Sequence, residues 1–268
     1  MTYAENLLQE AKKKYSLSKK VCEAYLRTPR HLFLTIFSTD YHHWLGVTPE
    51  TLPLVYDDKV LLLYEKEGFV STITQPSFVL RLLDLLDLQE GMRVFEVGAG
   101  SGWNAALMGH LVGKNGSVIS YEIIPEMALS ARKHLLGFDL PQVKVIPGDA
   151  LEEIRQEQKF DRGIFTAGAR DMPGILFDVI KDGGKLIFVL KTSHGDLMLA
   201  MIREHDHFKV YHRMNCHFVS ATGPILSTYQ NDLSMLYFTQ GEIKIYPQGT
   251  MGLRGNVIPG RDMIFEIT

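Results

Sequence analysis

Cysteine is scarce in this chain of 268 residues, which contains only Cys22 and Cys216. One pair of cysteines so far apart does not form a disulfide framework, and it favours a reducing compartment. Neither cysteine has a second ligand at the short spacing that is typical of zinc sites. We therefore expect a cytoplasmic protein without a metal centre.

Long apolar runs and a strong excess of one charge are also absent. No segment approaches the roughly 20 apolar residues that a membrane-spanning helix needs, and the N-terminus lacks the basic start and apolar run of a signal peptide. The 28 basic and 31 acidic residues leave a formal net charge of −3. Because no strong field of one sign follows, we expect neither nucleic acid nor a membrane as the main partner.

Helix and strand patterns alternate through the middle of the chain. Residues 3–27 have helical periodicity, and residues 30–70 are expected to be irregular. After these, the expected helices are 76–86, 104–112, 125–136 and 172–180, and the expected strands are 93–97, 117–121, 143–146, 163–165 and 185–190. This alternation predicts an α/β fold, a doubly wound and mostly parallel sheet with helices on both faces.

The helical patterns stop after about residue 200, and the remaining candidates are short strands. These candidates are residues 208–211, 216–219, 242–246 and 263–267. We expect a β-rich C-terminal tail that packs on the core and is not an independent domain.

A buried strand followed by a glycine loop is the most informative segment of the chain. Residues Val94–Gly102 read V-F-E-V-G-A-G-S-G, and a helix begins at Trp103. A dinucleotide-binding loop requires G-x-G-x-x-G, and Trp103 stands where its third small residue is needed. The glycines lie instead at Gly98, Gly100 and Gly102. This G-x-G-x-G spacing is typical of S-adenosylmethionine-dependent methyltransferases and disfavours a nicotinamide cofactor.

Acidic residues follow the next two strands, and a third lies inside the first strand. In an open α/β sheet, ligands bind beyond the carboxyl ends of the strands. We expect Glu122, beside Ile123, to accept hydrogen bonds from two ribose hydroxyls, and Asp149, beside Ala150, to meet the exocyclic amine of an adenine. Glu96 could orient the amine at the methionine end. Taken alone, the glycine loop at 98–102 is explained as a turn, Glu122 as a solvated strand end and Asp149 as a helix cap, but their order at the ends of three successive strands favours a nucleoside cofactor.

Several further segments occur in an order that points to one family. The segments are P-R-H-L-F at 29–33, Y-D-D-K at 56–59, T-I-T-Q-P-S at 72–77 and F-D-R-G-I-F-T-A at 160–167, with the glycine loop between the last two. From roughly residue 5 to residue 222 the chain resembles protein-L-isoaspartate O-methyltransferases. The resemblance implies a Rossmann-like methyltransferase domain over residues 1–222, which includes an N-terminal helical and irregular segment 1–75. Residues 223–268 are then a β-rich extension packed on the core.

The resemblance also implies the cofactor, the substrate and further site residues. The cofactor is S-adenosylmethionine, with S-adenosylhomocysteine as product, and the substrate is the isoaspartyl residue of damaged proteins or peptides. Thr72, Ile73 and Thr74 line the cofactor pocket, Thr222 belongs to a segment that closes it, and the Thr74 hydroxyl acts catalytically by orienting the acceptor carboxylate. Departures from the usual family residues occur at Thr74, Gln75, Ser77 and Ser220.

The chemistry of a carboxylate acceptor requires few groups from the protein. A carboxylate with a pKa of about 4 is already ionised at neutral pH, so methyl transfer needs no general base. Positioning and exclusion of water are enough. Two alternatives remain, a related carboxyl methyltransferase for another peptide or small molecule, and a non-catalytic S-adenosylmethionine-binding interaction protein. We expect a monomer, and Arg30 either orders the N-terminal segment over the site or completes a helix end.

Overall fold

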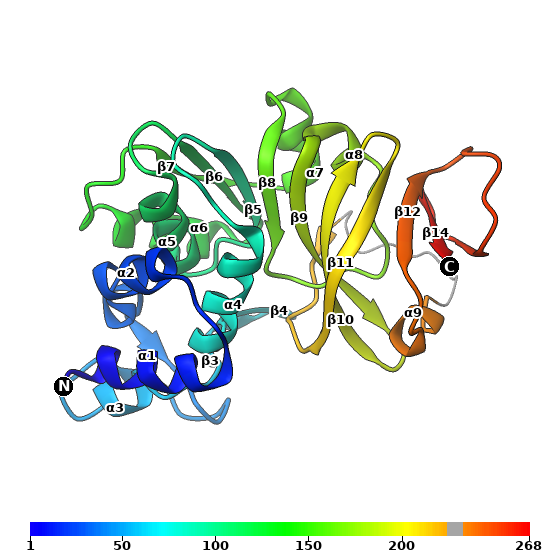
Figure 1. The fold of residues 1–268 in the computed structure, drawn as a ribbon. Coiled ribbons are helices and arrows are strands. Elements are labelled where there is room, and N and C mark those ends of the chain that lie inside the picture. The colour runs from blue at the N-terminus through cyan, green and yellow to red at the C-terminus, as the bar shows by residue number, and fades with distance from the viewer. Residues whose placement is uncertain (224–232) are drawn as a thin grey trace. The chain divides into compact units, whose positions relative to one another are not determined.

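The computed structural model describes residues 1–223 and 233–268, and the chain divides into two compact units (Figure 1). The first unit contains Met1–Val94 and Ala99–Gly148, and the second contains Phe95–Gly98 and Asp149–Thr268. The division passes through strand β5 (Arg93–Val97) and the glycine loop that follows it. The predicted cofactor residues are therefore distributed over both units.

Short helices form the N-terminal part of the first unit. Helix α1 (Tyr3–Lys14) begins at a capping box, in which the Thr2 hydroxyl accepts a hydrogen bond from the Glu5 N–H and the Glu5 carboxylate accepts one from the Thr2 N–H. Helix α2 (Lys19–Arg27) follows, so the predicted periodicity of residues 3–27 corresponds to two helices. After them come the 3-10 helix η1 (Arg30–Phe33), the two-residue strands β1 (Ile36–Phe37) and β2 (Leu45–Gly46), and α3 (Leu52–Val55).

The expectation of an irregular segment over residues 30–70 is wrong for its last third. Strands β3 (Leu61–Lys66) and β4 (Phe69–Ile73) form an antiparallel hairpin in which Lys66 pairs with Phe69. The two turn residues, Glu67 and Gly68, have φ angles of 53° and 82°. Positive φ at both positions is the geometry of a tight hairpin turn whose twist matches its strands.

The predicted alternation is confirmed in the rest of the first unit. It contains α4 (Pro76–Leu86), α5 (Trp103–Val112), β6 (Ser117–Glu122), α6 (Pro125–Leu135) and β7 (Val143–Pro147). Proline occupies the first turn of α4 and of α6, where its missing N–H costs nothing. Strands β6 and β7 pair in parallel, with Val118 opposite Val143 and Glu122 opposite Pro147.

A mixed sheet forms the centre of the second unit. Strand β8 (Phe160–Phe165) pairs in parallel with β9 (Ile180–Thr192), and all later pairings are antiparallel. The later strands are β10 (Gly195–Glu204), β11 (His207–Cys216), β12 (Ile243–Pro247), β13 (Asn256–Pro259) and β14 (Met263–Ile267), in the spatial order β13-β14-β12-β11-β10-β9-β8. The short helices are α7 (Ala150–Glu153), η2 (Ile154–Gln156), α8 (Ile175–Val179) and α9 (Met235–Phe238).

Several boundaries differ from the sequence predictions in this unit. Strand β10 was not predicted, because its core Leu197–Ala200 is an apolar run buried on both faces, which periodicity does not distinguish from a buried helix. The expected strand 216–219 is wrong, since β11 ends at Cys216. The expected helix 172–180 is reduced to α8, and one helical turn, α9, follows residue 200.

The β-rich character predicted for the C-terminal tail is observed. Strand β12 pairs with β11, and β14 and β13 continue the same sheet (Figure 1). Residues 224–232, which belong to the predicted extension, lie outside the described residues.

Candidate functional site

The glycine loop of the first unit approaches the end of β6 closely. The Gly100 N–H donates a hydrogen bond of 2.7 Å to Oε2 of Glu122. Gly100 and Gly102 have φ angles of 53° and 83°, which favour glycine. At Gly102 an added Cβ would lie 3.2 Å from the Cβ of Ala131 on α6, so a side chain would press on that helix.

Glu122 lies at the end of β6 and is only 5% exposed. Besides the Gly100 N–H, its carboxylate accepts a 3.0 Å hydrogen bond from the N–H of Ile124, the residue after Ile123. Burial raises the pKa of Glu122, and these backbone donors lower it in part. Each oxygen accepts one backbone hydrogen bond and keeps capacity for another, which suits a ligand with two adjacent hydroxyl groups.

The segment T-I-T-Q-P-S lies next to the same loop. A Cβ added at Gly100 would lie 3.6 Å from the Ser71 Oγ and 3.6 Å from the Thr72 carbonyl oxygen, which is ordinary van der Waals contact. The structure therefore brings Thr72 together with the glycine loop and, through Gly100, with Glu122. Sequence position alone separates Thr72 and Glu122 by 50 residues.

Arg30 organises the main chain of this region. The side chain is completely buried, and its guanidinium donates five hydrogen bonds to backbone carbonyl groups. The acceptors are Val55 at 2.7 Å, Asp57 at 3.3 Å, Lys59 at 3.0 Å, Ile73 at 3.3 Å and Thr74 at 3.2 Å. Burial lowers the pKa of Arg30 to about 10, so the group stays charged at neutral pH.

These contacts decide between the two interpretations of Arg30. Its hydrogen bonds hold the carbonyl groups of Ile73 and Thr74 against the Y-D-D-K segment, so the residue orders the predicted site and does not merely complete a helix end. From the sequence alone, this role and the helix-end role are both open. The sequence signal for a link between these segments was the occurrence of P-R-H-L-F and Y-D-D-K upstream of T-I-T-Q-P-S.

Asp58 holds the other end of the same segment. Its carboxylate accepts hydrogen bonds from the Ser77 N–H at 2.8 Å, the Ser77 hydroxyl at 2.6 Å and Nε2 of Gln75 at 3.0 Å, and it forms an ion pair of 2.6 Å with Lys14. Burial raises the pKa of Asp58, but the hydrogen bonds from Lys14, Ser77 and Gln75 outweigh it, so the net shift is downward. Gln75 and Ser77, two positions where the chain departs from the usual family residues, thus both donate hydrogen bonds to Asp58.

Trp103 connects the glycine loop to the P-R-H-L-F segment. Its indole Nε1 donates a 3.0 Å hydrogen bond to the Thr28 carbonyl oxygen, and the guanidinium carbon of Arg30 lies 5.7 Å from the ring centroid. The side chain is 2% exposed. The residue that argued against a dinucleotide loop is therefore a packing platform for Arg30.

In the second unit, the end of β5 is held by Thr166. The Thr166 hydroxyl donates to the Gly98 carbonyl oxygen at 2.6 Å and to that of Val97 at 3.0 Å. Gly98 has a φ of 97°, and a Cβ there would lie 2.6 Å from the Thr166 Oγ1. Glu96, two residues earlier, is completely buried within β5. Thr166 was part of the quoted F-D-R-G-I-F-T-A segment, but sequence analysis assigned it no role.

Asp149 presents one carboxylate oxygen that has no partner. Its Oδ1 accepts a 2.7 Å hydrogen bond from the Leu151 N–H. Asp149 therefore caps α7, as the helix-cap interpretation of this residue predicts. Its Oδ2 is buried and has no hydrogen-bond partner in the part of the chain that the structure describes. Since a buried acceptor without a donor is costly, this atom suits a ligand N–H. Ala150 beside it is buried.

Thr222 lies at the end of a chain segment that is joined to the β8 side of the second unit. The N–H of the preceding residue, Ala221, donates to the Gly168 carbonyl oxygen at 2.8 Å, and the Gly168 N–H donates to that of Val219 at 2.9 Å. Thr222 itself is partly exposed. This pairing places the segment that ends at Thr222 beside Gly168, in the loop that follows β8 and contains Thr166.

Residues 1–223 and 233–268 contain neither a metal-binding cluster nor a membrane-spanning helix. No group of three or more His, Cys, Asp or Glu side chains in these ranges is arranged to hold a metal ion. None of the helices found there has the length and apolar character needed to cross a membrane.

Comparison with known proteins decides the family. The family model of protein-L-isoaspartate(D-aspartate) O-methyltransferase matches residues 2–225. The chain belongs to this methyltransferase family. A protein-L-isoaspartate O-methyltransferase of Methanothrix thermoacetophila is 35% identical over 77% of this chain and 90% of its own length. That of Pyrococcus horikoshii is 35% identical over 77% of this chain and 86% of its own length.

Solved structures confirm the Rossmann-like methyltransferase fold. One protein-L-isoaspartate O-methyltransferase matches with a TM-score of 0.74 and 24% identity, over 99% of this chain and 88% of its own. A Plasmodium falciparum protein described as a member of the same family, solved with S-adenosyl-L-homocysteine, matches with a TM-score of 0.62 and 20% identity, over 83% of this chain and 99% of its own. The first match includes the C-terminal strands, so the extension also has a counterpart in a solved structure.

Proposed function

We propose that this chain transfers a methyl group from S-adenosylmethionine to a carboxylate of L-isoaspartyl residues in damaged proteins or peptides. The observation that carries the proposal is the match of the family model to residues 2–225, together with relatives at 35% identity that bear the name of this activity. The contacts around the glycine loop support the same conclusion, because they leave acceptors of the kind that a nucleoside cofactor requires.

In the first unit, we assign the ribose to Glu122 and the adjoining Ile123. The free acceptor capacity of the Glu122 carboxylate matches two vicinal hydroxyl groups, and its place beside the Gly100 N–H supports this role. Gly100 and Gly102 allow the backbone to approach the ligand. Thr72, Ile73 and Thr74 form the opposite wall, and the contact between the Thr72 carbonyl and Gly100 supports this assignment.

In the second unit, we assign the adenine amine to Asp149, with Ala150 beside it. The partnerless buried Oδ2 of Asp149 supports this role, since an exocyclic amine would supply the missing donor. Glu96 is assigned to the amine of the methionine moiety, Gly98 to the glycine turn, and Thr222 to closure of the site. The residues present therefore fit S-adenosylmethionine.

We assign to Thr74 the orientation of the carboxylate that accepts the methyl group. When bound, S-adenosylmethionine would supply an electrophilic methyl group for transfer to a carboxylate oxygen, with S-adenosylhomocysteine as the other product. The Thr74 hydroxyl donates a charge-assisted hydrogen bond to the acceptor carboxylate and orients that oxygen. Arg30 and Asp58 are positioning residues, because they fix the main chain on both sides of Thr74. The carboxylate is ionised at neutral pH, so no protein group needs to remove a proton.

The proposal is tested by measuring release of S-adenosylhomocysteine with an isoaspartyl peptide and with its normal aspartyl twin. Turnover of the isoaspartyl peptide alone is the expected result. Turnover of neither peptide, with cofactor binding retained in calorimetry, would favour a related carboxyl methyltransferase or a non-catalytic S-adenosylmethionine-binding protein. Absence of cofactor binding would overturn the proposal as a whole.

We further propose that residues 1–222 form the catalytic domain, with the N-terminal segment 1–75 as part of it, and that residues 223–268 are an extension packed on its core. The pairing of β12 with β11 supports this arrangement. A cytoplasmic location is proposed because Cys22 and Cys216 are both free thiols. The monomeric state remains a prediction, which light scattering of the purified chain tests.

A further inference from the structure

A hollow lies beside strands β10 and β11 in the second unit, and we name it the Arg213 hollow. Its volume of about 380 Å³ is within the range of small-molecule sites. It is lined by residues 213–215 of β11, by Leu197 of β10, by Tyr237 of α9, and by Thr239 and Gln240 after that helix. All of these residues belong to one compact unit.

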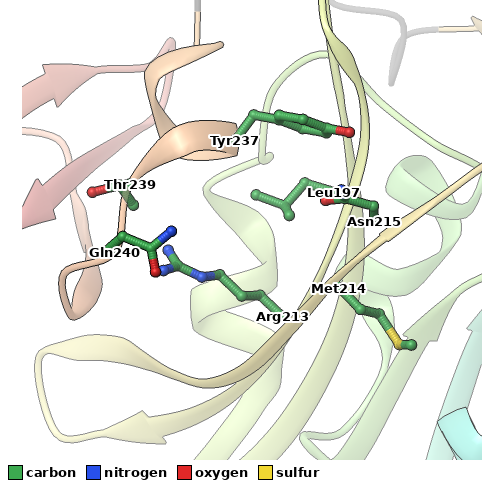
Figure 2. A pocket seen from close by; sticks show the side chains of 7 residues that line it. All are labelled: Leu197, Arg213, Met214, Asn215, Tyr237, Thr239 and Gln240. Carbon is green, nitrogen blue, oxygen red and sulfur yellow. The ribbon is translucent and has the colours of Figure 1, made fainter.

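One face of the sheet forms the floor of the Arg213 hollow. In the register of β10 and β11, Leu197 lies opposite Asn215 and Leu199 lies opposite Arg213. Residues that pair directly across two strands project from the same face, and so do residues two apart along one strand. Arg213 and Asn215 therefore project on the side that carries Leu197, which is 2% exposed. Figure 2 shows these side chains on one side of the hollow and the Tyr237 ring on the other.

The segment opposite this floor is held by contacts of its own. A Cβ added at Gly195 on β10 would lie 3.2 Å from the Tyr237 ring, so this ring packs directly on the strand backbone. The rings of Tyr237 and Phe238 also pack edge to face, with their centroids 5.3 Å apart. The Thr239 N–H donates to the Met235 carbonyl oxygen at 3.1 Å. The hollow is therefore bounded on both sides by fixed parts of the fold.

The lining of the Arg213 hollow carries one cation and no counter-ion. Nη1 of Arg213 is buried and has no hydrogen-bond partner among the residues that the structure describes. No Asp or Glu is among the seven described residues that line the hollow. Because a buried donor without an acceptor is costly, an oxyanion at this place would satisfy a group that the described chain leaves unused.

The other polar side chains of the lining determine which kind of anion fits. Asn215 and Gln240 carry carboxamides, and Tyr237 and Thr239 carry hydroxyl groups, so all four can both donate and accept hydrogen bonds. Such groups suit a ligand that bears hydroxyl groups of its own. An ammonium group would find no carboxylate in this lining, which disfavours amino acids. Only two of the seven lining residues are apolar, which disfavours fatty acids.

We propose that the Arg213 hollow binds a small hydroxylated organic anion, such as a sugar acid or a sugar phosphate, with its oxyanion on the Arg213 guanidinium. The hydroxyl groups of the ligand bond to the carboxamides and hydroxyl groups of the lining. Carboxylate and phosphate both match the planar guanidinium, so the experiment includes one anion of each kind. This binding site is additional to the proposed methyl transfer and does not depend on it.

Isothermal calorimetry with the full chain tests the charge contact. The probes are gluconate and glycerophosphate, and their neutral twins are sorbitol and glycerol, which carry hydroxyl groups without the charge. We expect at least one anion to bind with a Kd of about 1 mM or lower, and its neutral twin to bind at least about tenfold more weakly. Binding of gluconate alone identifies a carboxylate site, and binding of glycerophosphate alone identifies a phosphate site.

The proposed cofactor site is a second place where hydroxylated ligands could bind, so each titration is repeated in saturating S-adenosylhomocysteine. We expect the affinity for the anion to stay within twofold, because the Arg213 hollow does not include any residue that we assign to the cofactor. Loss of anion binding under this condition would place the anion in the cofactor site and overturn the proposal.

Substitutions locate the oxyanion and the hydroxyl groups. Arg213→Gln should weaken anion binding at least about tenfold, because it removes the charged donor. Arg254→Gln, an equal charge change on an exposed residue of the same unit, should stay within twofold. Tyr237→Phe keeps the ring but removes its hydroxyl group, and should weaken binding about threefold. Acetate and inorganic phosphate, which carry the charge without the hydroxylated body, should bind at least about tenfold more weakly than the matching probe.

Three results would contradict the charge contact. They are a Kd above about 1 mM for both anions, equal binding of an anion and its neutral twin, and an Arg213→Gln variant that binds like the wild type. Acetate or inorganic phosphate that binds as tightly as the matching probe would refute the hydroxylated class of ligand. Because no methyl acceptor is present, these results do not bear on methyl transfer, which is assayed separately.

Discussion

Arg30 in the first unit and Arg213 in the second both withdraw a guanidinium from water, but they differ in what surrounds it. Arg30 is fully buried and donates to five backbone carbonyl groups. Arg213 is partly buried, its buried Nη1 has no hydrogen-bond partner among the described residues, and it lies at a hollow lined by further donors (Figure 2). Arg30 keeps only its buried Nε without a partner, and its other donors stabilise the fold, whereas the unused Nη1 of Arg213 faces a hollow that a ligand can enter.

The largest expected difference between the two arginines is in the loss of unfolding free energy when each is replaced. Arg30→Met leaves five carbonyl groups without their donor, so we expect the free energy of unfolding to fall by about 3 kcal/mol or more. Arg213→Met breaks no hydrogen bond to a described residue and should change it by no more than about 0.5 kcal/mol. Urea denaturation at neutral pH measures both. Equal losses for the two variants would contradict the distinction.

The catalytic assignment predicts a second contrast between the units, at two threonines. Thr74→Val removes the hydroxyl that orients the acceptor, so kcat should fall about 100-fold while the affinity for S-adenosylmethionine changes little. Thr74→Ser keeps the hydroxyl and should retain most of the activity. Thr239→Val, at the residue that follows α9 in the second unit, should leave kcat unchanged with a short isoaspartyl peptide. An active Thr74→Val variant would remove Thr74 from the mechanism.

Two carboxylates that each accept two backbone N–H groups should differ in their effect on the cofactor. Glu122 is assigned to the ribose, so Glu122→Gln should weaken S-adenosylmethionine binding about 30-fold, as expected for loss of charge-assisted hydrogen bonds. Glu266 accepts from the N–H groups of Arg254 and Gly255 in the C-terminal strands. Glu266→Gln should leave cofactor affinity unaltered. Isothermal calorimetry compares them, and similar affinities for both variants would refute the ribose assignment.

The smallest expected effect concerns the pH dependence of stability. The pKa of Asp58 is lowered in the folded chain, so its contribution is present above the unfolded pKa of about 4 and is lost as the pH falls through the lower folded value. Asp58→Asn should therefore cost about 1.5 kcal/mol at pH 7 and progressively less below pH 4.

The exposed Asp182 in the second unit provides the comparison for Asp58. Its pKa is also lowered, chiefly by the hydrogen bond from the His205 N–H, but solvent screens its interactions. Asp182→Asn should change the pH profile less than Asp58→Asn. Thermal unfolding between pH 3 and pH 7 measures both profiles, and a flat difference for Asp58→Asn would show that its ionic contacts contribute nothing.

Prediction from sequence succeeded where the signal is local. The helices from Pro76, Trp103 and Pro125 begin within one residue of their predicted starts, because proline and glycine mark helix ends directly in the sequence. The β3–β4 hairpin was missed because residues 64–67 are polar and partly or fully exposed, which weakens the alternation of a strand. Strand β10 was missed for the opposite reason, a continuous apolar run.

The candidate site was predictable only as separate segments. The glycine spacing and the acidic residues after two strands identified Glu122 and Asp149 as candidates, and the structure gives each of them an acceptor suited to a ligand. The joint binding of Gln75 and Ser77 to Asp58 was not predictable. Their spacing from Asp58, 17 and 19 residues, indicates no contact until the chain is folded.

By itself, the sequence determined the class of fold and the family, because short-range spacing of glycine, proline and apolar residues acts through local backbone geometry. Only the tertiary structure decided what the two arginines do. Each is one basic residue in a polar sequence neighbourhood, and nothing local distinguishes them. The difference arises from segments distant in the chain, which surround Arg30 with carbonyl groups and leave a hollow beside Arg213.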